Sequence, residues 1–345
     1  MGAVQPSVQT LLEKPQFLLH RIDAASSQLV FLETTRELLS ALPFIDGRVQ
    51  LSPNRRSYSI RIQEALEWQA NDERSTQADR FIFHVSFCGS TLLARACDVP
   101  GRSFAYKEPR ALIDLATIKA RRLGQYTDRE LWSKLANLTL GQLRKPWSAG
   151  EVSVVKMSNW ANSTLIDLLQ HGRQPRAVLL SIGLRDFLKA VLRGGPSRID
   201  FTCRVLSHLQ AENEELGQLI EQSASLKADP MENVVRLAAL ARHAQIRIFD
   251  RALAMKSTRS VHCLSYEELV QHPAEAIKGV SQALNLNLSE QDIGAALNKA
   301  MVRDAKHPER FFDRQRARQI NRRVEKEYGH LIDRAIDWYQ LCLGH

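Results

Sequence analysis

Apolar residues in the middle of the chain fall into short runs, separated by stretches long enough for a helix. Five runs are expected to be strands: Phe81–Val85, Ser103–Tyr106, Val152–Met157, Ala177–Ile182 and Val261–Leu264. They lack the regular alternation of apolar and polar residues that marks a strand with one face in water. Short apolar strands separated by helices are typical of a parallel sheet covered on both faces. We therefore predict an α/β fold of three layers, with about five mainly parallel strands.

Helical patterns follow the fourth and fifth strands. One amphipathic helix is expected from about Arg204 through Leu216. A second begins at Asp229-Pro230, where aspartate can cap the helix and proline suits its first turn. Ser265-x-x-Glu268 has the spacing of a capping box, and Ser289-x-x-Asp292 has a weaker form of it. These signals predict where three of the later helices begin.

The chain divides into three regions that we expect to form one integrated domain. Residues 1–75 are predicted to be mainly helical and to pack on the core, with Leu38, Leu39 and Leu42 as core candidates. Residues 76–290 hold the α/β core, and residues 291–345 form a basic helical segment. A chain of 345 residues can bury a sizeable core.

Composition indicates a soluble protein of the cytoplasm. No apolar run is long enough for a membrane span, and the N-terminus lacks the basic and apolar regions of a secretory signal. The five cysteines are scattered and odd in number, which fits reduced thiols better than a disulfide framework or a zinc site. No known metal-binding motif is present. The histidines, His84 among them, are also scattered and are expected to be core or surface residues.

The formal charge of +9 is concentrated near the C-terminus. Residues 303–323 contain eight basic and three acidic residues, including Arg303 and Lys306. Such a cluster fits a polyanionic ligand or a nucleic-acid surface, and a solvated helix face is the alternative. Nothing else in the sequence favours nucleic acid.

The stretch from Arg80 to Arg95 is the most informative part of the sequence. It reads as a buried strand, a tight turn through Cys88-Gly89, and a helix that opens at Ser90-Thr91. Such a loop presents unpaired backbone N–H groups and is suited to an anion, most often a phosphate. In the register of the nucleotide-binding P-loop, Ser90 replaces the lysine that a nucleoside triphosphatase needs. A strand–turn–helix without any ligand is the alternative.

Polar residues also follow the other strands. They include Lys107-Glu108-Pro109, Lys156-Met157-Ser158-Asn159 and Arg185-Asp186. Because ligands of parallel sheets bind beyond the carboxyl ends of the strands, these side chains are expected to converge.

Five segments resemble the sulfotransferase family. One of them, Lys156-Met157-Ser158-Asn159, resembles the Lys-Thr-His-Leu-Pro segment of the cytosolic enzymes, and Lys156 matches its lysine. His84–Leu92 is similar to the loop that binds the 5′-phosphate of 3′-phosphoadenosine 5′-phosphosulfate, and Glu108-Pro109 resembles a pair in bacterial members. Arg185-Asp186 resembles the start of the 3′-phosphate motif, and Leu264–Leu284 resembles the segment YEDLV-x-x-P and its helix. Phe87 replaces the lysine of the loop, and Ser158 stands where the cytosolic enzymes have their catalytic histidine.

The resemblance implies a P-loop-like fold and a sulfuryl transfer, without a metal, to a hydroxyl or amine of a small molecule or glycan. The 5′-phosphate would be held by the loop, and the 3′-phosphate by Arg185 and Arg193 with help from Arg303 or Lys306. Lys156 would act at the bridging oxygen in place of the loop lysine, and Glu108 would be the base. The implied residues of the loop are Ser86, Cys88, Gly89, Ser90, Thr91 and Leu92.

Two other functions stay open. Phe87 and Ser158 replace residues that the better-known enzymes use, so one alternative is a relative of these enzymes that has lost transfer activity and serves as a binding or scaffolding protein. A P-loop kinase is disfavoured by the missing loop lysine, and also because Ala177–Ile182 is not followed by the aspartate that such kinases use for magnesium. The sequence identifies neither the acceptor nor the oligomeric state.

Overall fold

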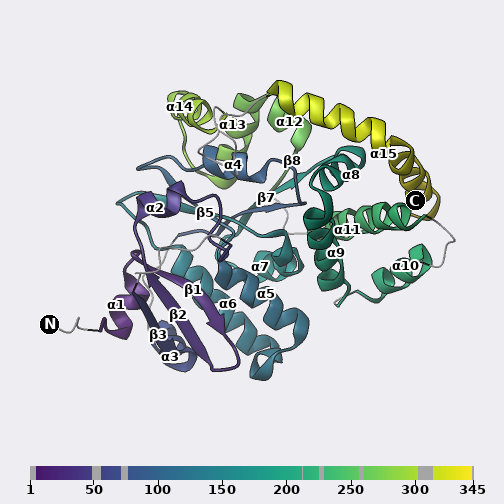
Figure 1. Cartoon of the computed structure of the whole chain (residues 1–345). Coiled ribbons are helices and arrows are strands. Elements are labelled where there is room, and N and C mark those ends of the chain that lie inside the picture. Colours follow the sequence, from purple (N-terminus) through teal and green to yellow (C-terminus); the bar gives the residue numbers. More distant parts are fainter. Residues whose placement is uncertain are drawn as a thin grey trace.

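A central sheet crosses the molecule, with helices on both sides of it and a smaller sheet near the N-terminus (Figure 1). The structure, a computed structural model, describes residues 5–48, 56–70, 77–211, 213–224, 229–255, 260–301 and 314–343. No helix within these ranges is both long enough and apolar enough to span a membrane.

The central sheet has the strand order β5-β6-β4-β7-β8, and all neighbouring strands are parallel. Its strands are β4 (Arg80–His84), β5 (Ser103–Lys107), β6 (Val152–Lys156), β7 (Arg176–Ser181) and β8 (Val261–Ser265). β4 and β5 are buried along their whole length, which explains why their sequences do not alternate. The predicted α/β fold and its five strands are confirmed, with every boundary within one residue of its predicted position.

Helices cover both faces of this sheet (Figure 1). One face carries α4 (Ser90–Ala96), α12 (Tyr266–Gln271), α13 (Pro273–Leu284) and α14 (Glu290–Met301). The opposite face carries α5 (Arg110–Arg121), α6 (Arg129–Leu143) and α7 (Leu165–His171), with the short helices η1 (Gly124–Thr127) and η2 (Asn159–Thr164). The three layers predicted from the sequence are therefore present.

A further group of helices extends the molecule beyond the end of β7. They are α8 (Leu184–Arg193), α9 (Gly195–Gln210), α10 (Glu214–Ala224), α11 (Pro230–Leu253) and α15 (Arg314–Leu343). α11 packs against α8, α9, α10 and α15, and α15 also packs along α8. Ile332 and Trp338 anchor α15 in this group, since both are buried.

The helix predicted from Arg204 through Leu216 is wrong as a single element. α9 ends at Gln210, and α10 begins only at Glu214. Asn213 causes the restart, because its side-chain oxygen accepts a hydrogen bond of 3.2 Å from the backbone N–H of Leu216. An asparagine between two amphipathic patterns is a start signal that periodicity alone does not show.

The predicted helix starts are confirmed. Asp229 caps α11 by accepting a hydrogen bond from the N–H of Met231 at 2.7 Å. Ser265 and Glu268 form a complete capping box at α12. Ser289 and Asp292 exchange the same pair of hydrogen bonds, of 3.1 and 2.9 Å, before α14.

The N-terminal region is not mainly helical, which corrects the prediction for residues 1–75. It contains the antiparallel sheet β1 (Phe17–Asp23), β2 (Gln28–Glu33) and β3 (Ser57–Arg61), with helices α1 (Val8–Glu13), α2 (Arg36–Ala41) and α3 (Ile62–Ala70). Leu29 and Phe31 on β2 point into the core. Their period of two is masked because Val30 and Leu32 on the opposite face are also apolar.

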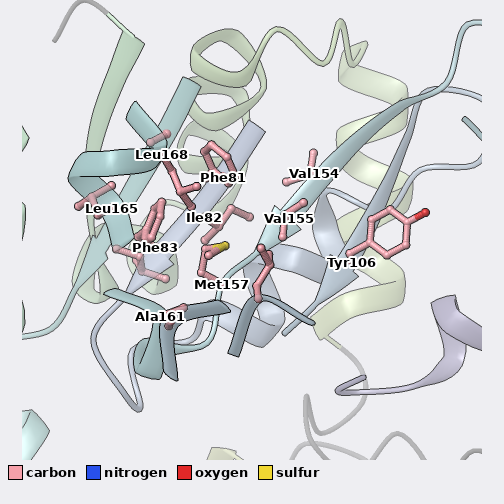
Figure 2. Close-up of a cluster of buried hydrophobic side chains, with 14 of the residues drawn as sticks. Phe81, Ile82, Phe83, Tyr106, Val154, Val155, Met157, Ala161, Leu165 and Leu168 are labelled. Atoms are coloured by element: carbon pink, nitrogen blue, oxygen red, sulfur yellow. The ribbon is translucent and has the colours of Figure 1, made fainter. Parts of the chain in front are cut away.

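One large buried cluster runs through most of the molecule, and a second, smaller one lies between α9, α10, α11 and α15. Figure 2 shows Leu165 and Leu168 of α7 packed beside Phe81 and Phe83 of β4. The same buried cluster includes N-terminal residues from Leu11 onward and reaches α15 near the other end of the chain. Burial of this kind fixes the carboxyl ends of the strands, where the polar residues lie.

Candidate functional site

The loop between β4 and α4 has the conformation of an anion cradle. Phe87 and Gly89 both lie in the left-handed region, with φ of +65° and +80°. Gly89 precedes the first residue of α4, and no side chain caps that helix. Within the described part of the chain, the backbone N–H groups of Gly89, Ser90 and Thr91 have no acceptor. The loop predicted from the sequence therefore leaves several donors for a ligand.

Gly89 fits this loop for two reasons. Its positive φ disfavours residues with a Cβ, and a Cβ here would lie 3.3 Å from side-chain atoms of Tyr266 and Leu269. The loop thus rests on α12. Two segments that separately resemble sulfotransferases, the loop and the segment beginning at Leu264, are in contact in the structure.

Phe87, which stands in the place of the expected lysine, lies next to a positively charged side chain. Its ring packs against the ring of Phe187 at 5.9 Å between centroids. The guanidinium carbon of Arg198, on α9, lies 4.9 Å from the Phe87 ring centre. No sequence spacing connects these two residues, so sequence reasoning missed Arg198.

Lys156 and Glu108, the two predicted catalytic residues, form a buried ion pair. Glu108 follows β5 and Lys156 ends β6, the neighbouring parallel strand, and Lys156 Nζ donates to Glu108 Oε1. Glu108 Oε2 accepts a hydrogen bond of 2.7 Å from Arg48 Nη2. The side chain of Lys156 is 1% exposed and that of Glu108 is 9% exposed. Glu108 also has a φ of +58°, a strained value for a residue with a side chain.

The carboxyl group of Glu108 is held in its ionised form. Burial raises its pKa, but the nearby positive groups, with Lys156 first, outweigh burial and lower the pKa below its ordinary value. An ionised carboxylate can accept a proton from a substrate. Here both oxygens already accept hydrogen bonds, and Arg48, whose side chain is 51% exposed, is on the open side of the pair.

His84 also belongs to this site, although its sequence gave no functional signal. Its Nδ1 and Nε2 each lie 2.9 Å from a backbone carbonyl oxygen, of Val85 and Met157 respectively. Its Nε2 is 4.0 Å from Glu108 Oε1. Burial and the Lys156 cation lower the pKa of His84 to about 4, so the ring is neutral at pH 7. A neutral ring has one N–H and donates to one of these carbonyls at a time.

Ser86 and Ser158 are occupied within the protein. Asn159 Nδ2 donates to Ser86 Oγ, which ties the loop to the end of β6. Ser158 caps η2, and its hydroxyl accepts from the N–H of Trp160 at 3.4 Å. The residue at the position of the family's histidine is therefore a helix cap.

The structure does not bring Arg185 to the Lys156–Glu108 pair. Arg185 Nη1 donates to Asp333 and Nη2 to Glu325, both at 2.6 Å and both on α15. Arg193 Nη1 donates to Asn321 Oδ1 on the same helix at 2.9 Å. The 3′-phosphate role of both arginines stays a prediction. Two further residues assigned to it, Arg303 and Lys306, lie outside the described residues.

Of the two arginines, Arg193 is the one whose charge acts on Tyr266, a residue that packs against the loop. Tyr266, which touches Gly89, has its pKa raised because burial outweighs the opposing cation of Arg193. A third arginine lies at the carboxyl end of β7: Arg242 of α11 donates through Nε to the carbonyl oxygen of Ile182 at 2.7 Å. Arg242 sits mid-helix, far from Ile182 in the sequence, so no motif could reveal this contact.

Among the described residues, no three His, Cys, Asp or Glu side chains are grouped to hold a metal ion. What the site offers is a set of backbone donors, a buried lysine–carboxylate pair and a neutral imidazole at one edge of the sheet. This set can bind an oxyanion and accept a proton near it.

Comparison with known proteins adds little to this description. No protein-family model matches the chain, and no curated protein matches its sequence. Among solved structures, the fold is similar to a sulfotransferase domain from the curacin biosynthetic pathway, with a TM-score of 0.38 and 11% identity. The match covers 74% of this chain and 99% of that domain. Similarity at this level assigns neither a family nor an activity.

Proposed function

We propose that the protein binds 3′-phosphoadenosine 5′-phosphosulfate and transfers its sulfuryl group to a hydroxyl or amine. The main support for the proposal is that an anion-binding loop and a buried ion pair lie together at the carboxyl edge of the sheet. There the loop after β4, with its unpaired N–H groups, lies next to the buried Lys156–Glu108 pair, to which His84 at the end of β4 is adjacent. The sequence resemblance of these same segments to sulfotransferases supports the choice of cofactor.

Each group has a role that follows from its chemistry. The N–H groups of Gly89, Ser90 and Thr91 hold the 5′-phosphate. Lys156 supplies positive charge where the bridging oxygen becomes negative, since sulfuryl transfer is an in-line displacement helped by neutralising the leaving group. Glu108 takes up the proton that the acceptor molecule releases. The acceptor approaches Glu108 from the side of Arg48, whose half-exposed side chain can move aside.

A second candidate is a protein that binds the nucleotide without transferring the sulfuryl group. The observation that favours it is the engagement of Glu108, whose two oxygens are already held by Lys156 and Arg48. A carboxylate in this position can be a structural partner as well as a base.

Calorimetric titration of the whole chain tests the binding half of the proposal. Adenosine 3′,5′-bisphosphate should bind, and ATP with magnesium should not compete with it. Preference for ATP with magnesium would instead favour a P-loop kinase. Failure to bind either nucleotide would remove the proposed cofactor.

Mass spectrometry tests the transfer half. Incubation with the phosphosulfate donor and a panel of phenols, alcohols, amines and glycans should yield a product heavier by one SO₃ group. Tight bisphosphate binding without transfer to any acceptor would favour the second candidate.

A further inference from the structure

A short segment of the N-terminal region, residues 44–48, lies against the end of β5 beside Glu108. The backbone N–H of Ile45 donates to the carbonyl oxygen of Lys107 at 2.8 Å, and the N–H of Arg110 donates to the carbonyl oxygen of Ile45 at 3.3 Å. These two hydrogen bonds lie on either side of Glu108 in the sequence. Ile45 is also buried, so the segment is fixed against the carboxyl edge of the sheet.

Arg48, the last residue of this segment, is held over Glu108 by several contacts. Its guanidinium carbon lies 3.9 Å from the ring centre of Phe44. Its Nε donates to Asp46 Oδ2, and its Nη2 donates to Glu108 Oε2 at 2.7 Å. The backbone N–H of Arg48 also donates to Asp46 Oδ1 at 3.0 Å. An aromatic ring and two carboxylates therefore hold the guanidinium in one orientation.

Arg48 nevertheless keeps donors for a ligand. Its side chain is 51% exposed, whereas Asp46 and Glu108 are buried. Its Nη1 has no hydrogen-bond or ion-pair partner among the described residues. A guanidinium that is held in place, half exposed and supplied with free N–H groups suits a carboxylate, to which arginine can donate two parallel hydrogen bonds.

The contact of Arg48 with Glu108 bears directly on the proposed base. Glu108 Oε1 accepts from Lys156 and Oε2 accepts from Arg48, so both oxygens are engaged. A carboxylate that binds Arg48 competes with Glu108 for this cation. Because Arg48 is one of the positive groups that lower the pKa of Glu108, a weaker contact between the two raises that pKa and makes Glu108 a stronger base. An anionic acceptor thus frees the base as it binds.

We propose that the acceptor carries a carboxylate close to its reacting hydroxyl or amine, and that Arg48 recognises this carboxylate. The inference rests on the proposed function, in which Glu108 is the base. The carboxylate pairs with Nη1 of Arg48, and the hydroxyl or amine takes the place of Nη2 beside Glu108 Oε2. Because Nη1 and Nη2 are bonded to the same carbon, the two groups of the acceptor lie only a few bonds apart.

The transfer itself is balanced without a further reactant. The O–H or N–H proton of the acceptor passes to Glu108 Oε2 while the oxygen or nitrogen of the acceptor forms a bond to sulfur. The bond between sulfur and the bridging oxygen breaks, and its electron pair stays on the bridging oxygen, next to the charge of Lys156. Arg48 takes no part in these bonds. It determines which acceptor binds and whether Oε2 is free.

Transfer rates with matched pairs of acceptors test the inference on the whole chain. Mandelate and mandelamide are a pair of alcohols, and meta-hydroxybenzoate and meta-hydroxybenzamide are a pair of phenols. The members of each pair differ in charge. For at least one pair, kcat/KM should be about tenfold or more higher for the acid than for the amide. Values for both acids that are no higher than those for their amides overturn the inference.

Arg48→Gln is the decisive variant, with Arg102→Gln as its matched control. Arg102 is 55% exposed and pairs with a carboxylate, as Arg48 does, but it precedes β5 at the opposite edge of the sheet. The ratio of kcat/KM between acid and amide should fall close to one in Arg48→Gln and keep its wild-type value in Arg102→Gln. Arg48→Lys, which keeps the charge without the two-donor fork, should show an intermediate ratio. A ratio that Arg48→Gln leaves unchanged overturns the role of Arg48.

Calorimetry gives a second readout that needs no turnover. With adenosine 3′,5′-bisphosphate bound, the preferred acid should bind more tightly than its amide, and Arg48→Gln should remove this difference. Thermal melts show whether the variant is folded, and Arg48→Lys decides if it is not.

Failure of this inference can be told from failure of the proposed function. If wild type transfers to neutral acceptors but to neither acid, the inference alone is wrong. If wild type transfers to no acceptor of the wider panel, the proposed function is removed and this inference with it.

Discussion

The guanidinium of Arg198 lies over the ring of Phe87, 4.9 Å from its centre. Phe87 occupies the loop position where the resemblance to sulfotransferases expects a lysine, so a cation from α9 stands next to that position. Arg198 is itself held by the carbonyl oxygen of Ala190, to which its Nη1 donates at 2.7 Å. In this way a neighbouring helix can provide the positive charge that the expected lysine would provide from within the loop.

Arg198→Met should lower the rate of sulfuryl transfer by about tenfold or more while changing bisphosphate affinity only a few-fold. The reason is that the charge matters most when the bridging oxygen becomes negative. Steady-state rates with a donor and an identified acceptor give the first quantity, and calorimetry gives the second. Arg204→Met, at an exposed position on the same helix, is the matched control. Equal rates in the two variants would exclude Arg198 from the reaction.

Lys156→Met should reduce the free energy of unfolding by about 3–5 kcal/mol, because it leaves the buried carboxylate of Glu108 with Arg48 as its remaining partner. Glu108→Gln should also destabilise the protein, since it leaves the Lys156 charge buried. The double variant should be more stable than the sum of the two losses predicts. Urea unfolding of the four proteins measures this coupling.

The same variants separate structure from catalysis. If Lys156 acts on the bridging oxygen, Lys156→Met should cut the transfer rate by roughly a hundredfold and spare bisphosphate affinity, in a protein that is still folded. A folded Lys156→Met variant that transfers at the wild-type rate would leave the pair with a structural role alone.

The neutral state of His84 makes stability fall in mild acid. The pKa of this histidine is lowered from 6.5 to about 4, so below pH 6.5 the unfolded chain takes up a proton that the folded chain does not. Stability is complete above the unfolded value and is lost as the pH falls through this window. The loss amounts to at most about 3 kcal/mol.

Urea unfolding at about pH 7.5 and about pH 5 measures this loss. His84→Gln should show a smaller difference between the two conditions than wild type. His330→Gln, at an exposed position on α15, should show the wild-type difference. An unchanged difference in His84→Gln would mean that other groups, such as the buried His208, whose pKa is also lowered to about 4, account for the acid sensitivity.

Gly89→Ala should destabilise the protein and abolish nucleotide binding. A residue with a Cβ costs about 1–2 kcal/mol in the left-handed region, and here its methyl group would also press on Tyr266 and Leu269 at 3.3 Å. Gly101→Ala is the matched control, because Gly101 has a φ of +76° but open space around its Cβ position. It should show the backbone cost alone and bind the bisphosphate normally. Similar melting temperatures and affinities for the two variants would contradict the close contact at Gly89.

Arg185→Ala should weaken adenosine 3′,5′-bisphosphate about tenfold to a hundredfold more than adenosine 5′-phosphate, which lacks the 3′ dianion. Glu325→Gln should strengthen bisphosphate binding, because it removes a carboxylate that now pairs with Arg185. Calorimetry with the two nucleotides distinguishes the effects. Equal losses for both nucleotides in Arg185→Ala would take this residue out of the 3′-phosphate site.

The central sheet could be predicted from sequence because each of its strands carries a local signal. Phe81–Val85 is apolar throughout, and the glycine that follows it marks the turn into α4. The two residues of a capping box, such as Ser265 and Glu268, also lie within a few positions of each other in the sequence. The N-terminal sheet was missed because β2 has apolar residues on both faces, which hides its period of two.

The contacts of the candidate site were predicted only in part, because several of them join residues that are far apart in the sequence. Lys156 and Glu108 were expected to converge with other polar residues at the carboxyl ends of the strands. That they meet as a pair follows from the strand order, in which β5 and β6 are neighbours. The partners of Arg185 on α15 lie about 140 residues away, and nothing local indicates which face of α8 the last helix covers. His84 is buried, as expected of a core histidine. The contacts of His84, Arg198 and Arg242 involve segments that are distant in the sequence, so no local pattern showed them.

The position of β4 in the sheet has a consequence for how the protein is made. β4 pairs with β6 on one side and with β7 on the other, and both follow it in the chain. During synthesis on the ribosome, this apolar strand has neither neighbour until residues 152–156 and then 176–181 have emerged. For that interval Phe81, Ile82 and Phe83 have no strand beside them. A nascent chain stalled before β6 should therefore be a chaperone substrate, and one stalled beyond β7 should have begun to protect this strand.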